Sequence, residues 1–219
     1  MLGQGDTEGV FQLESSGMKQ VLVGLQPQNL EDVIALISLY RPGPMDSIPT
    51  YLRNRHEPDK ISYKTPQLAH ILDVTNGCIV YQEQVMQIFR ELAGFSFGQA
   101  DNVRRAMSKK KHAVMEAERE HFVHGCTDPG NQCPGCVANG ISEKVANEIY
   151  DEMSSFASYA FNKSHAACYA YVAFQTAYLK CHYPSEFMAA LLTSVLDNTD
   201  KVIELSLIHI SEPTRHSLI

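Results

Sequence analysis

Apolar residues recur every three or four positions along most of the chain, which is the spacing of one buried face of an α-helix. The clearest example is residues 29–40, where Asn29 stands at an N-cap position and two acidic residues follow in the first turn. The segment Arg41-Pro42-Gly43-Pro44 ends this helix, because proline has no amide donor and keeps the preceding residue out of the helical region. The same spacing predicts six more helices, at residues 82–93, 99–108, 112–123, 142–156, 164–182 and 184–196.

Residues that start or stop helices support these boundaries. Ser142 and Ser164 stand at N-cap positions, Pro184 is at a first helical position, and Gly94 follows a last one. Residues 78–81 are the only short run that reads as a strand. We therefore expect a mainly α, multi-helix fold with at most minor β structure.

Composition narrows the class of protein. The chain has 219 residues, of which 44% are hydrophobic and 20% charged, so collagen-like, coiled-coil and disordered chains are excluded. No apolar run approaches the roughly 20 residues needed to cross a bilayer, and no signal peptide opens the chain, so we expect a cytoplasmic protein without a membrane partner. The net charge of -7 argues against binding nucleic acid through overall charge and leaves only a local basic patch.

One such patch lies near the middle of the chain. Arg104, Arg105, Lys109, Lys110 and Lys111 place five cations within eight residues. On a helix the two arginines lie about 100° apart, so the group wraps the end of the helix and its following turn. This arrangement suits a polyanion such as a phosphate chain, and the alternative is a solvated charged face.

A second group of cations lies at a predicted helix start. Lys163 precedes the capping Ser164, and His165 falls in the first turn, where free backbone donors favour an anion. The alternative is a capped helix whose lysine faces water. Arg41 sits in its proline-rich turn, where it can face a ligand or pair with a carboxylate.

Three cysteines lie in a turn-rich insertion at about residues 124–140. Cys126, Cys133 and Cys136, with His124, have spacing compatible with one structural zinc ion, since thiolates two residues apart on a tight turn can share a metal. The alternative is a turn that carries thiols without a metal. If zinc is present, the chain could be a zinc-stabilised helical interaction module with no nucleotide role.

The chain lacks two sequence motifs that commonly support phosphoryl transfer. It has no Asp-x-Asp pair and no Gly-x-x-x-x-Gly-Lys-Ser/Thr loop. The residues alone thus indicate a helical domain that can hold phosphates but has no reaction centre of its own.

Six motifs, in order along the chain, carry a resemblance to a known family. They are Gly9-Val10-Phe11-Gln12-Leu13-Glu14-Ser15-Ser16-Gly17-Met18, Tyr40-Arg41-Pro42-Gly43-Pro44-Met45, Tyr81-Gln82-Glu83-Gln84-Val85-Met86, Ala100-Asp101 with Arg104-Arg105-Ala106-Met107, Phe161-Asn162-Lys163-Ser164-His165-Ala166, and Tyr183-Pro184-Ser185-Glu186-Phe187-Met188. From about Asp6 to Glu204 the chain resembles the fingers domain of the C-family polymerases, the bacterial replicative DNA polymerase III alpha subunits.

The resemblance implies that the chain is part of a DNA-directed DNA polymerase, a nucleotidyltransferase whose palm and fingers domains have different roles. In that family a palm domain carries three aspartates that bind two Mg²⁺ ions, and the fingers close over the incoming nucleotide. The fragment is then expected to be inactive alone. Its partners would be template-primer DNA, the dNTP, the remaining polymerase domains and the replication holoenzyme with its sliding clamp.

The resemblance also suggests which cations meet which ligand. We expect the triphosphate to be bound by Arg104, Arg105, Lys163, His165 and Arg41. Lys109, Lys110 and Lys111 are expected to contact the periphery of the triphosphate or the backbone of the template DNA.

The end of the chain differs from the rest. Residues 205–219 look like the translated sequence of a transposase adapter used in preparing sequencing libraries. We therefore expect a fingers-domain fragment at residues 1–204 and a non-native tail at residues 205–219.

Overall fold

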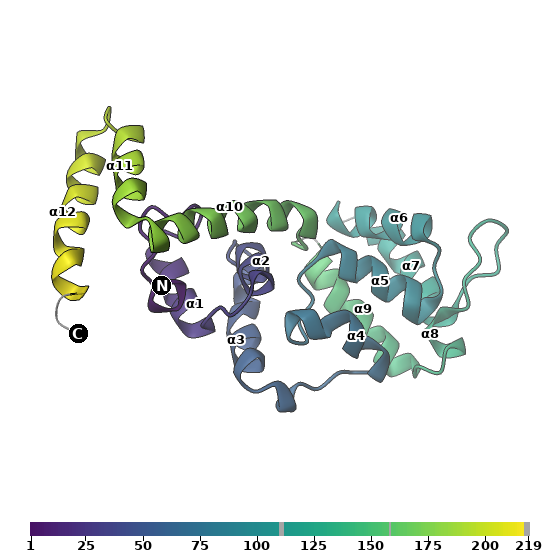
Figure 1. Ribbon diagram of the computed structural model, residues 1–219. Helices are drawn as coiled ribbons and strands as arrows, with labels where there is room; N and C mark the ends of the chain where they lie inside the picture. Colours follow the sequence, from purple (N-terminus) through teal and green to yellow (C-terminus); the bar gives the residue numbers. More distant parts are fainter. Residues whose placement is uncertain (110–111, 158, 217–219) are drawn as a thin grey trace. The chain divides into compact units, whose positions relative to one another are not determined.

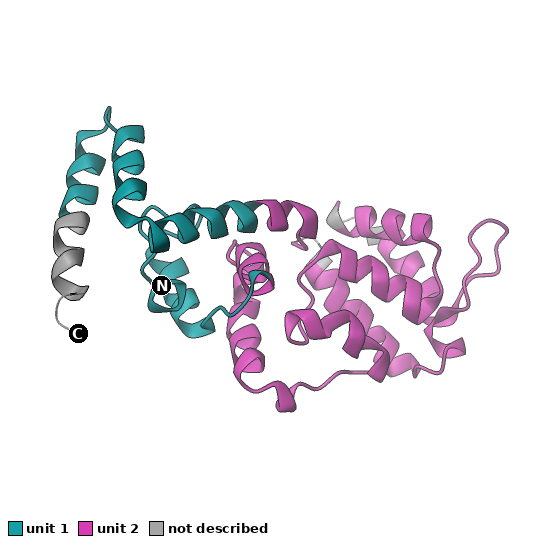
Figure 2. Ribbon diagram, in the orientation of Figure 1, with its two compact units in different colours: residues 1–30, 169–219 teal, residues 31–168 magenta. Residues whose placement is uncertain are grey.

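Helices form nearly all the regular structure of the chain (Figure 1). The computed structural model describes residues 1–109, 112–157 and 159–216. Within these residues β structure is limited to two isolated bridges, Tyr81 with Phe161 and Cys126 with Cys133. The expected mainly α fold with minor β structure is confirmed. The chain divides into two compact units, residues 1–30 with 169–219 and residues 31–168 (Figure 2), a division that the sequence did not predict.

The smaller unit is made of residues from both ends of the chain. Its helices are η1 (Leu2–Gln4), α1 (Ser16–Leu25), the second half of α10 (Lys163–His182), α11 (Pro184–Ser194) and α12 (Thr199–His216). The N-terminal segment is tied to α10 by a buried lysine, because Lys180 is only 5% exposed and pairs with Asp6 and Glu8. Phe11 also stacks on Tyr169, with 5.7 Å between ring centroids.

The larger unit contains the remaining elements. They are α2 (Leu30–Leu39), η2 (Pro44–Ser47), α3 (Ile48–His56), η3 (Pro58–Lys60), η4 (Pro66–Leu68), α4 (Ala69–Leu72), η5 (Asp73–Thr75), α5 (Gln82–Ala93), α6 (Phe97–Ser108), α7 (His112–His124), α8 (Gly135–Ala138), α9 (Glu143–Ala157) and the start of α10. Aromatic rings join these helices at the core. Phe89 of α5 is fully buried and packs edge-on against Phe122 of α7 and Tyr150 of α9, with centroids 5.0 and 6.0 Å apart.

The strand expected at residues 78–81 does not form. Only Tyr81 makes a bridge, because the amide groups of Val80 and Tyr81 donate to the Oε1 of Gln84, at 2.9 and 3.0 Å, instead of to a neighbouring strand. The Nε2 of Gln84 donates to the carbonyl of Ile71 and to the hydroxyl of Thr75. One buried glutamine side chain thus replaces the hydrogen bonds that a sheet would supply.

Two helices that bear expected site residues begin earlier than their spacing suggested. Helix α6 starts at Phe97 because Ser96 and Gln99 form a reciprocal capping box. Helix α10 starts at Lys163, and its cap is Asn162, whose Oδ1 accepts from the His165 amide at 2.9 Å. Ser164 therefore lies inside the first turn, so its expected capping role is wrong.

The expected boundary at residue 204 has no counterpart in the secondary structure. Helix α12 continues to His216, and Leu205 is 1% exposed. A non-native origin of residues 205–219 stays a prediction. Across the described residues, the helices are too short or too polar to span a membrane.

Candidate anion-binding site

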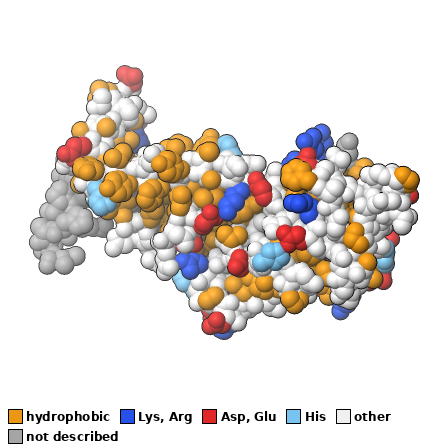
Figure 3. All heavy atoms as spheres, turned by 45° about the vertical axis from the view of Figure 1, so that its right-hand side comes forward, with side chains coloured by type: hydrophobic (Ala, Val, Ile, Leu, Met, Phe, Trp, Pro, Cys, Tyr) orange, Lys and Arg blue, Asp and Glu red, His pale blue; other side chains and the backbone are white. Residues whose placement is uncertain are grey.

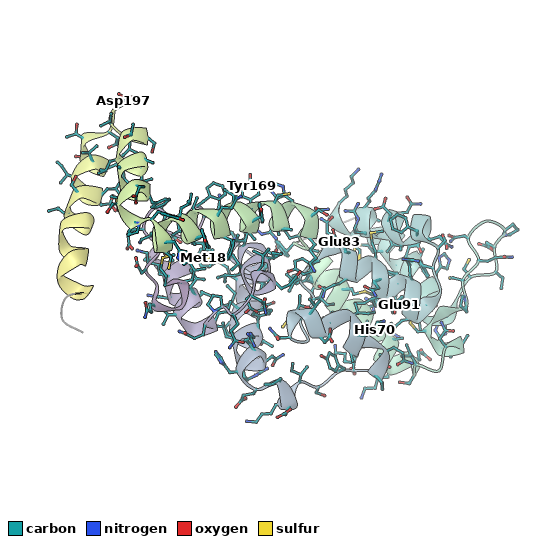
Figure 4. The ribbon with its side chains drawn as sticks, viewed as in Figure 1. Met18, His70, Glu83, Glu91, Tyr169 and Asp197 are labelled. Carbon is teal, nitrogen blue, oxygen red and sulfur yellow. The ribbon has the colours of Figure 1, made fainter. Side chains whose placement is uncertain are left out.

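A surface hollow of about 480 Å³ lies in the larger unit, along α5 and the start of α6. Its lining combines basic and acidic side chains with amides and apolar groups: Gln82, Glu83, Met86, Gln87, Arg90, Glu91, Phe97, Asp101, Arg104 and Asn162. Figure 4 shows Glu83 near the first turn of α5, and Glu91 farther along it beside His70. Of the expected phosphate-binding residues, Arg104 lines this hollow directly.

Asp101 holds both expected arginines. Its Oδ1 accepts from the Nε and Nη2 of Arg104 at 3.0 and 2.7 Å, and its Oδ2 lies 2.8 Å from the Nη2 of Arg105. The hydrogen bond from Arg104, with the positive charges of both arginines, lowers the pKa of the Asp101 carboxyl. The two guanidinium groups are thereby fixed on one side of α6, although Arg105 remains 65% exposed.

We expect the pKa of Asp101 to lie below its ordinary value of 3.8. Since the folded pKa is depressed, this pairing contributes stability above the unfolded value and loses it as the pH falls through the folded value. Arg104→Ala should raise the pKa of Asp101 more than Arg105→Ala, because the Arg104 hydrogen bond is the main cause. Carboxyl carbon chemical shifts measured against pH would show this, and equal shifts in the two variants would contradict it.

Gln82 connects this arginine to a distant part of the chain. Its Oε1 accepts from the Nη1 of Arg104 at 2.9 Å, and its Nε2 donates to the carbonyl of Ala160 at 2.9 Å. Its backbone amide donates to the carbonyl of Phe161, also at 2.9 Å. The start of α5 therefore ties α6 to the connector that leads into α10.

The start of α10 is already occupied by acidic side chains. The Lys163 amide lies 3.1 Å from both carboxylate oxygens of Glu83, and the Nζ of Lys163 pairs with Glu31 at 3.0 Å. The expected free backbone donors are thus filled by Glu83 and Asn162. Lys163 adjoins the hollow through its neighbour Asn162, and any external anion must compete with Glu83 and Glu31.

Arg41 and His165 lie beside the same connector. Arg41 donates to the carbonyls of Ser38 and Tyr159 at 3.0 and 2.8 Å, and its guanidinium lies 4.1 Å from the centroid of the Phe161 ring. Burial lowers the pKa of Arg41. The ring of His165 is exposed and packs edge-on against Phe161 at 5.4 Å. Arg41 thus braces the connector, and neither residue lines the hollow.

The lysines expected to meet DNA are only partly described. Lys109 is exposed at the C-terminal end of α6, whereas Lys110 and Lys111 lie outside the described residues. On the face drawn in Figure 3, basic and acidic side chains are interspersed among the described residues. The electrostatic character of this face is mixed, in agreement with the acidic composition.

The structure does not bring the four expected zinc ligands together. Among the described residues, no group of three or more His, Cys, Asp or Glu side chains could hold a metal ion. Cys136 is fully buried in the apolar core, away from solvent, and this burial raises its pKa to about 12. His124 instead lies 3.9 Å from Glu120 and Glu143. The zinc-stabilised module therefore loses the site on which it depends.

Sequence reasoning missed the polar residues that organise the hollow. Gln82, Glu83, Asp101 and Asn162 belong to the six motifs, but their types and spacing do not predict the bonds that they make. Gln82, Glu83 and Asn162 share one available signal, a polar side chain at a helix start, where it can bond to backbone groups of another element. The sequence could not show which element that would be.

Comparison with known proteins gives a consistent result. Residues 1–130 match the profile of the bacterial DNA polymerase III alpha subunit finger domain. The chain is 50% identical over 209 residues to a DNA polymerase III subunit alpha of Thermus aquaticus, covering 93% of this chain and 16% of that protein. It is 46% identical over 205 residues to that of Staphylococcus aureus strain Mu50, covering 94% of this chain and 18% of the relative. The chain thus spans less than a fifth of the length of these curated relatives.

Proposed function

Because this chain belongs to the bacterial DNA polymerase III alpha subunit family, as a finger domain, we propose that it binds the triphosphate of an incoming dNTP and the template-primer DNA within a DNA-directed DNA polymerase. The observation that carries this proposal is the position of Arg104. It lines one hollow with Asn162, the residue before Lys163, although some 60 residues separate the two in sequence. Two cation-bearing motifs therefore converge on one surface.

The pairing of these cations with the chain's own carboxylates is compatible with binding a triphosphate. The side chains of Lys163 and Glu31 are 34% and 46% exposed, and partly exposed ion pairs typically contribute about 0–1 kcal/mol. A triphosphate carries about four negative charges and offers several oxygens to each guanidinium, so charge-assisted bonds to it are stronger. Asp101 and Glu31 would then hold the cations in position until the polyanion displaces them.

DNA would be held through its backbone. Lys109 lies at the C-terminal end of α6, and Lys110 and Lys111 follow it in the sequence. These lysines would contact phosphates without reading sequence, as template-directed synthesis requires. Such binding should weaken steeply as salt rises, because each neutralised phosphate releases a counterion. Arg41 and His165 would act by holding the connector and the first turn of α10.

The described residues do not fit the two magnesium ions that the polymerase reaction uses. Three convergent carboxylates would be needed, and the part of the chain that the structure describes brings no such group together. We propose that palm aspartates elsewhere in the parent polymerase supply this site. The chain alone should be inactive, and the whole enzyme should act in the cytoplasm with its holoenzyme and sliding clamp.

The proposal is tested by replacing Arg104 and Arg105 together with alanine. Loss of two charge-assisted contacts, each worth about 1.5–3 kcal/mol, should weaken dATP binding by at least about tenfold. Titration calorimetry of the chain with dATP, and anisotropy of a labelled primer-template across a salt series, would measure this. DNA binding should change less than dATP binding.

A matched control removes the same charge elsewhere in the larger unit. Arg53 and Lys60 are exposed on α3 and η3, outside the hollow, and Arg53→Ala with Lys60→Ala should leave dATP affinity within about twofold at moderate salt. An equal loss of dATP affinity in both double variants would show that the effect comes from the overall charge of the chain. An unchanged dATP affinity in the arginine variant would overturn the assignment.

A further inference from the structure

The insertion between α7 and α8 presents two cysteines directly opposite each other. Cys126 and Cys133 exchange both backbone hydrogen bonds, each 2.9 Å long, as the single bridge of a narrow antiparallel neck. Residues paired in this way have Cα atoms about 5.5 Å apart. Disulfides span Cα separations of about 4.4–6.8 Å, and the separation of such a pair lies within this range.

Two glycines, Gly125 and Gly135, allow the backbones beside this neck to approach each other closely. A Cβ on Gly125 would stand 2.5 Å from the carbonyl oxygen of Pro134, and one on Gly135 would stand 2.3 Å from the Gly125 nitrogen. Both glycines have positive φ, +89° and +79°, which few other residues adopt. The two backbones therefore pass in contact next to the pair formed by Cys126 and Cys133.

Both cysteines also lie at the same hollow. Cys126 and Cys133 both line an open hollow of about 270 Å³, together with Thr127, Gln132 and Pro134. Cys126 is half-buried and Cys133 is 8% exposed, so a small solute can approach the first sulfur more easily. Burial raises the pKa of the Cys133 thiol. Because Cys126 is the more exposed of the two residues, its sulfur is the one that a small oxidant meets first.

We infer that Cys126 and Cys133 form a reactive dithiol, a modification site that closes to a disulfide when the chain meets a peroxide. The Cys126 thiolate attacks the peroxide, a sulfur–oxygen bond forms, the oxygen–oxygen bond breaks, and hydroxide leaves. The Cys133 sulfur then attacks this sulfenic sulfur, forming the disulfide and releasing water. The two thiols lose two electrons and two protons, and hydrogen peroxide is reduced to two waters.

The other cysteines are poorly placed to compete. Cys136 is fully buried, and Cys78 is 8% exposed with a pKa that burial raises to about 11. Cys168 and Cys181 are exposed and lie 13 positions apart in the sequence of α10, and a helix rises about 1.5 Å per residue, so they are too far apart along it to pair. An intramolecular disulfide should therefore form selectively at the neck.

Peptide mapping after treatment with hydrogen peroxide tests this directly. The folded chain should fall from six free thiols to four, with one disulfide joining Cys126 to Cys133, and dithiothreitol should restore all six. Cys126→Ser should abolish the intramolecular disulfide, whereas Cys168→Ser should leave it unchanged. Circular dichroism of each variant would show that the helices are retained.

The same treatment in urea provides a second measurement that needs no variant. In an unfolded chain the shorter loop closes more readily, so Cys133 should pair mainly with Cys136. Selectivity for Cys126 in the folded chain, and its loss on unfolding, would support the inference. A Cys133–Cys136 disulfide in the folded chain, a disulfide between molecules only, or six surviving thiols would overturn it.

Discussion

Replacing Gln84 with leucine is expected to lower the free energy of unfolding by about 3–5 kcal/mol. The Gln84 side chain is 4% exposed. Its Oε1 accepts from the amides of Val80 and Tyr81, and its Nε2 donates to the Ile71 carbonyl and the Thr75 hydroxyl. Leucine has a similar volume but leaves these groups without their partner. Each buried group that loses its bond costs about 1–3 kcal/mol, and local relaxation recovers part of the sum. Urea unfolding followed by circular dichroism measures the change.

Gln87 provides a matched control on the same helix. It is partly exposed and its Nε2 donates to Glu91, one turn further along the helix, at 2.7 Å, so Gln87→Leu should change the unfolding free energy by about 0.5 kcal/mol or less. Equal effects of the two leucines would show that the buried bonds of Gln84 contribute little. A selective effect should extend to function, because the segment that Gln84 fixes leads directly into Gln82 and its bond to Arg104.

Local sequence signals predicted the helices well where caps and periodicity agree. Helix α5 spans Gln82–Ala93 as its spacing and Gly94 indicated, and Gly94 adopts the left-handed conformation that ends it. The signals misplaced the start of α10 because Ser164 and Asn162 are both good caps, and only the observed bond from the His165 amide decides between them.

The candidate site was less predictable because its bonds cross the sequence. The sequence indicated Arg104, Arg105 and Lys163 as candidate phosphate-binding residues. The structure places Arg104 in a hollow next to the start of α10. The bond from Gln82 to the Ala160 carbonyl spans 78 residues, and nothing local to either residue specifies it. The cysteine spacing likewise suggested a metal, because spacing cannot show that Cys136 enters the apolar core.

Replacing Gly135 with alanine is expected to have a comparably large effect, a loss of about 2–5 kcal/mol of unfolding free energy. The new Cβ would lie 2.3 Å from the Gly125 nitrogen and 2.6 Å from the His124 carbonyl carbon, and both contacts are with backbone that cannot rotate away. Overpacking of this kind costs about 1–3 kcal/mol, to which the left-handed φ of +79° adds about 1–2 kcal/mol.

Gly130→Ala separates these two causes. Gly130 has nearly the same conformation, with φ of +85°, but nothing lies within 4 Å of its missing Cβ, so alanine there should cost only about 1–2 kcal/mol. If the two variants lose equal stability in urea unfolding, the close backbone approach at Gly135 is unimportant. If Gly135→Ala alone is severe, its residual folded population should also lose the selective Cys126–Cys133 disulfide, because the same backbone contact holds the two cysteines opposite each other.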